Sequence, residues 1–149
     1  MKILVATDGT KHSKAALAKV ADFKLGAEDE INIVSVVDMA VPMSVDMYGG
    51  YITPTADIEK NVREVAEKIL EDAKSYISEQ IKTVAVNTEI LYGSPDSRIV
   101  ETAEKIAADL IIVGSHGYNR WERILLGSVS DSVVHHANCS VLVVRTADE

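Results

Sequence analysis

Cysteine and positive charge are both scarce in this sequence. Cys139 is the single cysteine, which excludes an intramolecular disulfide and a cysteine-rich metal cluster and favours a reducing, cytoplasmic location. The 15 Lys and Arg residues stand against 23 Asp and Glu residues, a formal net charge of −8. Nucleic-acid binding depends largely on Lys and Arg, so neither DNA nor RNA is expected as the main partner. A local phosphate site stays open, because backbone N–H groups can form one without net positive charge.

Long apolar runs are also missing. The opening run, residues 3–6, is too short for the apolar part of a signal peptide. The run at 110–113 directly follows Asp109, and it falls far below the ~20 residues that cross a bilayer. We therefore expect neither export nor a membrane span. What is present is 47% apolar residues over 149 positions, which predicts one domain, residues 1–149, around one core.

Short β-branched runs alternate with stretches of helical period. Most of the runs are continuously apolar, which is typical of strands covered on both faces in a parallel sheet. The predicted strands are residues 3–7, 31–37, 84–91, 110–113 and 141–144. The predicted helices are about 13–25, 58–81, 94–106 and 128–137. This order predicts a single-domain, doubly wound α/β fold, with a five-stranded parallel sheet and helices on both faces.

Two helices and one connecting segment can be interpreted further. Apolar residues recur in steps of three and four from Ile58 to Ile81, which predicts one wide apolar seam lying on the sheet. Ser94 is expected to cap the next helix, with Pro95 at its first position. The segment 40–57 fits neither helix nor strand. Its methionines and tyrosines leave two readings open, a cover over a ligand or another subunit, and an ordinary surface loop.

The end of the first strand carries one candidate site. In an open parallel sheet, ligands bind beyond the carboxyl ends of the strands, where the winding direction reverses. Asp8 follows the first strand there and precedes Gly9 and Thr10. A carboxylate in this position can hold a metal ion or accept a hydrogen bond from a sugar hydroxyl. The alternative is that Asp8 only accepts backbone N–H bonds in an Asx turn or helix cap.

The end of the fourth strand carries a denser signal. Gly114 and Gly117 are followed, after nine residues, by Gly127 and Ser128 at a helix start. Glycine allows positive φ and a close approach of backbone N–H groups to an anion. The helix start adds unsatisfied N–H donors and the positive end of its dipole, and the hydroxyls of Ser128 and Ser130 are further donors. The pattern predicts a phosphate site that is neither a Gly-x-Gly-x-x-Gly fingerprint nor a Walker A loop; ordinary turn glycines are the alternative.

Together these motifs resemble the ATP-binding branch of the universal stress protein family. That branch is marked by Gly, two residues, Gly, nine residues, Gly and then Ser or Thr, the spacing found from Gly114 to Ser128. The segments 5–10, 93–95 and 109–117 are similar as well, so the resemblance covers essentially the whole chain. One departure is Ser140, which stands where the family usually has proline before the final strand.

The resemblance implies a fold of the adenine-nucleotide alpha-hydrolase type and a site for ATP with a divalent cation, Mg²⁺. The residues implied to cradle the phosphates are Gly117, Gly127, Ser128, Val129 and Ser130, with Gly114 near the ribose. Those implied to border the adenosine are Thr7, Asp8 and Val36, and Asp8 is also the candidate metal ligand. A homodimer through adjoining final strands is implied too, and the apolar run 141–144 suits such edge pairing.

These inferences predict a cytoplasmic, ATP-binding stress-response protein that acts as a nucleotide-dependent switch toward an unidentified protein partner. No residue is compelled into the role of catalytic base, so any ATP hydrolysis is expected to be slow or partner-dependent. Two alternatives stay open. One is a small hydrolase or nucleotide transferase that uses Asp8 and the glycine loop; the other is an interaction module with an empty pocket.

The remaining reactive side chains carry weaker signals. His135 and His136 are adjacent, so on a helix they point about 100° apart and form no two-ligand metal face. His116 lies within the candidate phosphate loop and could contact a ligand, but it is interpreted as a turn histidine without a catalytic role. Cys139 is interpreted as a small packing residue.

Three residues of the nine-residue spacer, Arg120, Trp121 and Arg123, stay ambiguous. A guanidinium matches phosphate oxygens, so one arginine could reach a terminal phosphate. The alternative is a solvated arginine pair, with Trp121 covering the loop or a dimer partner. The sequence does not choose between them.

Overall fold

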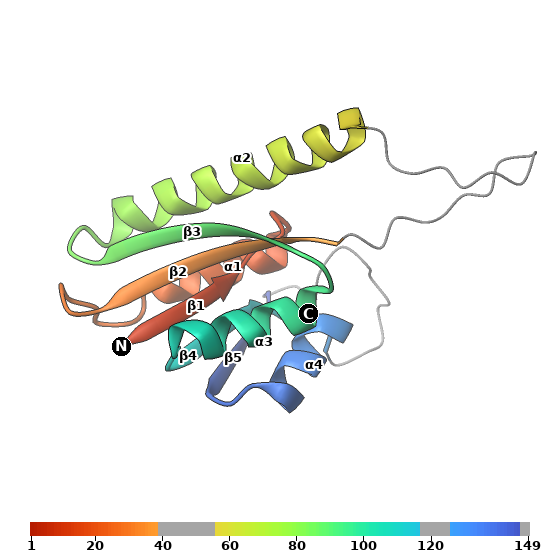
Figure 1. Cartoon of the computed structure of the whole chain (residues 1–149). Coiled ribbons are helices and arrows are strands. Elements are labelled where there is room, and N and C mark those ends of the chain that lie inside the picture. Colours follow the sequence, from red (N-terminus) through yellow and green to blue (C-terminus); the bar gives the residue numbers. More distant parts are fainter. Residues whose placement is uncertain (39–55, 117–125, 147–149) are drawn as a thin grey trace, which may run out of the picture.

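The fold is an alternation of strands and helices around one parallel sheet. The computed structural model describes residues 1–38, 56–116 and 126–146. Its elements are β1 (Lys2–Ala6), α1 (Lys11–Val20), β2 (Glu30–Val37), α2 (Ala56–Gln80), β3 (Ala85–Tyr92), α3 (Pro95–Ile106), β4 (Leu110–Gly114), α4 (Ser128–His136) and β5 (Ser140–Val144). The sheet is five-stranded, in the order β3-β2-β1-β4-β5, and every pairing is parallel (Figure 1). The predicted α/β fold is therefore confirmed.

Helices cover both faces of the sheet because successive strand residues point to opposite sides. Ile3 and Val5 of β1 are fully buried in a cluster that includes residues of α1 and α2. Leu4, between them in the sequence, is fully buried in a second cluster with residues of α3 and α4. A central strand with two buried faces has no room for alternating polar residues, which explains its continuously apolar sequence.

The winding of the chain reverses between β1 and β4. From β1 the chain moves outward through β2 to β3, then crosses back to β4 on the other side of β1 and continues to β5. The register of β1 with β2 ends at Val34, and its register with β4 ends at Ile112. A topological switch point of this kind is the place where open α/β sheets bind ligands.

The first half of α2 departs from the predicted apolar seam. The residues of α2 that are buried are Ala66, Leu70, Ala73 and Ile77. Ile58, Val62 and Val65, by contrast, are 51%, 42% and 58% exposed. Figure 1 shows that α2 and the sheet separate toward the N-terminal end of the helix. The prediction of one buried seam is wrong there, because a helical period shows which face is apolar but not where the covering sheet ends.

The ends of the helices differ modestly from the expected ones. Thr10 caps α1 by accepting a hydrogen bond from the Ser13 amide at 3.4 Å, so the helix begins at Lys11 and ends earlier than predicted, at Val20. Ser94 is the N-cap of α3, but its side chain makes no capping bond. Within the described ranges, no helix is both long and apolar enough to span a membrane.

Candidate functional site

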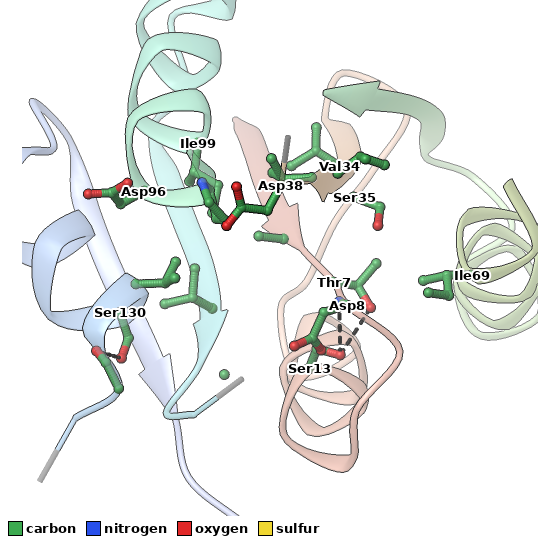
Figure 2. A pocket seen from close by; sticks show the side chains of 18 of the residues that line it. Thr7, Asp8, Ser13, Val34, Ser35, Asp38, Ile69, Asp96, Ile99 and Ser130 are labelled. Carbon is green, nitrogen blue, oxygen red and sulfur yellow. Dashed lines mark hydrogen bonds between the residues drawn. The ribbon is translucent and has the colours of Figure 1, made fainter. Parts of the chain in front are cut away.

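A cavity of about 700 Å³ lies at the carboxyl ends of β1, β2 and β4. Its described walls also include residues of α2 and α3 and the first turn of α4. Figure 2 shows Ser130, Asp8 and Ile69 arranged around it, from α4, from the loop after β1 and from α2. The cavity therefore lies at the switch point of the sheet, and its volume is in the range of small-molecule pockets.

Most of the residues singled out from the sequence line this cavity. They are Thr7, Asp8, Val36, Gly114, Gly127, Ser128, Val129 and Ser130. Gly117 lies outside the described residues, as do Arg120, Trp121, Arg123 and all but the last two residues of the segment 40–57. The lining residues are far apart in the sequence. The parallel topology brings them together, because the carboxyl ends of all the strands meet at one edge of the sheet.

The first turn of α4 supplies the most open hydrogen-bond donors. The first bond of the helix runs from the Asp131 amide to the Gly127 carbonyl at 2.9 Å. The amides of Ser128, Val129 and Ser130 precede it, and none of them has an acceptor in the part of the chain that the structure describes. These are the orphan donors expected at a helix start. Because all three residues line the cavity, the positive end of the helix dipole faces it.

Two contacts with the end of β4 hold this turn in place. The Gly127 amide donates to the Ser115 carbonyl at 2.7 Å. The Ser130 hydroxyl lies 3.0 Å from the same carbonyl and 2.9 Å from the carbonyl of Gly127. In this structure the Ser130 hydroxyl is therefore an internal donor, not the open donor expected from the sequence. Its backbone amide remains open.

Gly114 and Gly127 allow neighbouring backbone atoms to lie close to them, and neither glycine has a positive φ. Among the described glycines, positive φ occurs at Gly9 and Gly93 only. A Cβ on Gly114 would lie 2.7 Å from the His12 carbonyl carbon, and one on Gly127 would lie 3.0 Å from the Ser115 carbonyl oxygen. The physical reason given for these glycines in the sequence analysis is thus corrected: a side chain would push α1 or the β4 end away.

Asp8 adopts the alternative role that its sequence context left open. Its Oδ1 accepts hydrogen bonds from the Thr10 amide at 3.0 Å and from the Thr10 hydroxyl at 2.6 Å, which forms an Asx turn. No donor reaches Oδ2 from the described residues, so one carboxylate oxygen stays available to a cation or hydroxyl. No group of three or more His, Cys, Asp or Glu side chains placed to hold a metal ion occurs in the described ranges.

The end of β2 exposes an unpaired backbone edge. The ladder between β1 and β2 closes with the bond from the Thr7 amide to the Val34 carbonyl, at 2.9 Å. Alternate residues of a strand direct their backbone groups to the same neighbouring strand. The N–H and C=O of Val36 therefore point to the same side as those of Val34, at a level beyond the end of β1. Neither its N–H nor its C=O has a backbone partner on that side in the described chain. A donor and an acceptor thus lie next to each other at the cavity wall.

Asp96 is a cavity residue whose role the sequence analysis missed. Its Oδ1 accepts the Ser94 hydroxyl at 2.6 Å, and its Oδ2 accepts the Ser132 hydroxyl of α4 at 2.7 Å. These donors, first Ser94 and then Ser132, hold the pKa of Asp96 below its ordinary value, and the backbone N–H groups of Ser97 and Asp96 add to the effect. The only sequence signal was a carboxylate in the first turn of a helix.

The charge of the described cavity wall is entirely negative. Asp8, Asp38 and Asp96 line it, and no Lys or Arg is found among the described lining residues. Opposite α4, the wall is apolar and is formed by Val62, Val65, Ala66 and Ile69 of α2. These residues belong to the apolar seam that was predicted to lie on the sheet, because periodicity alone cannot separate a core face from a pocket wall.

His116 and Cys139 have different surroundings. His116 lines the cavity, with its Nδ1 3.2 Å from the Ser115 hydroxyl and its ring 5.4 Å from that of His12. Cys139 packs against the apolar cluster under α3 and α4, which agrees with its interpretation as a packing residue. Burial, and then the charge of Asp109, raise the pKa of the Cys139 thiol.

Comparison with known proteins agrees with this architecture. The sequence matches the Universal stress protein family over residues 1–145. The chain belongs to this family. Putative universal stress proteins from Staphylococcus haemolyticus and from Staphylococcus aureus strain USA300 are 33% and 35% identical to it over 147 residues; these alignments cover 98% of this chain and 85% and 84% of the relatives.

Solved structures extend the likeness to three dimensions. Hypothetical protein MJ0577 is 31% identical and superposes with a TM-score of 0.83, covering 99% of this chain and 97% of that one. A universal stress protein solved in complex with cAMP is 25% identical, with a TM-score of 0.71 and coverage of 99% and 98%. The universal stress protein fold thus extends over nearly the whole length of the chain, including the strand ends around the cavity.

Proposed function

We propose that this universal stress protein binds ATP in the cytoplasm and uses the bound state to change its contacts with another protein. The observation that carries the proposal is the open first turn of α4, where three consecutive amides, 128–130, line the cavity without acceptors in the described chain. Helix starts of this kind bind phosphate through their N–H groups and dipole. The relative in complex with cAMP supports an adenine nucleotide as the ligand class.

The cavity fits both ends of such a ligand. The amides of α4 suit the phosphates, and Gly114, whose lack of a side chain keeps the β4 end close to His12, suits the ribose region. The unpaired N–H and C=O of Val36 suit adenine, which carries an amino donor beside ring-nitrogen acceptors. Asp8 is left to meet a ribose hydroxyl or the cation through its Oδ2.

We propose that Mg²⁺ accompanies ATP. A polyphosphate entering the cavity meets the Asp8 carboxylate and no described Lys or Arg, and a divalent cation reduces the repulsion between them. The Asp8 Oδ2 is one oxygen ligand for it, with the phosphates and water completing the shell, as is usual for Mg²⁺. When bound, the cation supplies charge neutralisation at the phosphates.

Binding without fast turnover is the activity we propose. No described residue is compelled into the role of base, because the Asp8 Oδ1 accepts two hydrogen bonds from Thr10 and only its Oδ2 is left. Purified protein alone should therefore hydrolyse ATP more slowly than ~1 s⁻¹, the low end of ordinary enzymes. A small hydrolase or nucleotide transferase acting at the same site is the second candidate, and the available Oδ2 of Asp8 is the observation that favours it.

We also propose that two copies pair through β5. This strand forms one edge of the sheet, and its residues 141–144 are only half-buried within a single chain. An apolar edge strand of this kind invites pairing with a second copy. Light scattering at micromolar concentration should give the mass of a dimer, and a monomer would contradict the proposal.

Isothermal calorimetry with ATP, ADP and AMP in the presence of Mg²⁺, run with a product assay, tests the function. Heat without product supports the switch. Heat with product above ~1 s⁻¹ supports the enzyme. Absence of heat for every nucleotide overturns both and leaves an interaction module with an empty pocket.

A further inference from the structure

Two helices, α3 and α4, begin at the cavity, and their first turns present different groups to it. In α3, the first turn carries the Asp96 carboxylate, which lines the cavity and accepts the Ser94 hydroxyl at 2.6 Å. In α4, the amides of 128–130 have no acceptor among the described residues. The start of α3 therefore presents a carboxylate to the cavity, whereas the start of α4 presents open amides to it.

The same carboxylate reaches across to α4. Its Oδ2 accepts the Ser132 hydroxyl at 2.7 Å, a contact between residues 36 positions apart. Ser132 lies four residues after Ser128 and thus one turn further along α4, so this bond ties the first two turns of α4 to α3. Beneath it, Val133 is fully buried in one cluster with Ile99 of α3. The hydrogen bond of Ser132 and the apolar cluster of Val133 both join α4 to α3.

The hydrogen bonds of the carboxylate explain why its charge does not exclude an anion nearby. Two hydroxyls donate to Asp96, that of Ser94 to Oδ1 and that of Ser132 to Oδ2. Their dipoles offset part of the negative charge, and they fill one acceptor position on each carboxylate oxygen. Both oxygens of Asp96 are thus engaged within the chain, in contrast to Asp8, whose Oδ2 is available.

We propose that Asp96 and Ser132 are positioning residues for anion binding: their hydrogen bond orients the first turn of α4 so that the amides of 128–130 face the cavity. The bond from the Gly127 amide to Ser115 fixes the same turn from the β4 side. The identity of the anion as a nucleotide phosphate rests on the proposed function. The positioning of α4 for an anion can be tested without it.

Calorimetry and NMR titrations with inorganic pyrophosphate, ADP and adenosine test this role. Ser132→Ala should weaken pyrophosphate and ADP by about 3- to 10-fold, the value of one hydrogen bond, and leave adenosine unchanged. Ser132→Thr, which keeps the hydroxyl, should restore affinity. Asp96→Asn provides a second variant, with a loss in the same direction, should Ser132→Ala fail to fold.

The chain offers a matched control. Asn138, just beyond α4, donates a hydrogen bond to the Glu104 carboxylate of α3, and neither residue lines the cavity. Asn138→Ala therefore removes a contact between the same two regions and should leave all three affinities unchanged.

Each outcome decides the question. Equal losses for adenosine and pyrophosphate, equal losses in Asn138→Ala and Ser132→Ala, or no pyrophosphate binding by the wild type would overturn the positioning role. Pyrophosphate binding with the expected variant pattern, but no binding of ATP or ADP, would uphold this inference and refute the proposed function.

Discussion

Replacing Ser128 by proline removes one backbone donor from the candidate phosphate site without removing the helix. Ser128 is the first residue of α4, the position where proline is most readily accepted, because its amide has no partner within the helix. The preceding Gly127 has φ −70° and ψ 157°, a conformation that a residue before proline adopts without strain. Gly127→Val is a poorer test, since its Cβ would meet the Ser115 carbonyl oxygen at 3.0 Å and displace the loop.

The expected effect follows from the number of open donors. A hydrogen bond from an amide to a charged oxygen contributes about 1.5–3 kcal/mol, so losing one of the three amides of 128–130 should weaken ATP or ADP by about 10- to 100-fold. Ser128→Ala removes the hydroxyl and keeps the amide. The difference between the two variants isolates the backbone donor.

Calorimetry of the wild type and both variants, with thermal unfolding as a check on the fold, measures this difference. Unchanged melting with a selective loss in Ser128→Pro is the predicted pattern. Equal affinities for Ser128→Pro and Ser128→Ala would refute the view that the amide binds phosphate.

Three further predictions concern stability and reactivity. Ile77→Ala, at a fully buried position of α2, should lower the free energy of unfolding in urea by about 2–5 kcal/mol, whereas Val65→Ala, 58% exposed on the same helix, should change it by less than about 0.5 kcal/mol; similar losses would show that the first half of α2 is packed after all. The pKa of Asp96 is lowered by the Ser94 and Ser132 hydroxyls, so its charged form stabilises the fold at neutral pH, and the stability advantage of the wild type over Asp96→Asn should shrink as the pH falls below about 4; a gap that widens in acid would contradict this sign. Burial, and then Asp109, raise the pKa of Cys139, so a thiol reagent at pH 7 should modify the folded protein more slowly than the urea-unfolded chain, and equal rates would contradict the burial.

The sequence was sufficient to predict the fold because its signals are local and repeated. Apolar runs such as 110–113 alternate with helical stretches, and only a few topologies accommodate that order. The rule that ligands bind beyond strand ends indicated the loops that carry Asp8 and Gly114, whereas Thr7 was implied by the family resemblance; all three residues line the cavity.

The features that escaped prediction depend on distances between elements. The period of α2 could not show that Val62 and Val65 leave the sheet and line a pocket. The bond between Asp96 and Ser132 depends on how α3 and α4 pack, and no local pattern encodes a contact 36 residues apart. Gly127 lines the cavity, but the feature that limits a side chain there is the nearby Ser115 carbonyl and not its own φ.

The most direct test of the account follows the backbone amides of Ser128, Val129 and Ser130 by ¹⁵N–¹H NMR during a titration with ATP and Mg²⁺. We predict that these three signals shift most, and that they also shift with pyrophosphate but not with adenosine. Saturable ATP binding that leaves all three signals unmoved would contradict the claim that the first turn of α4 holds the phosphates.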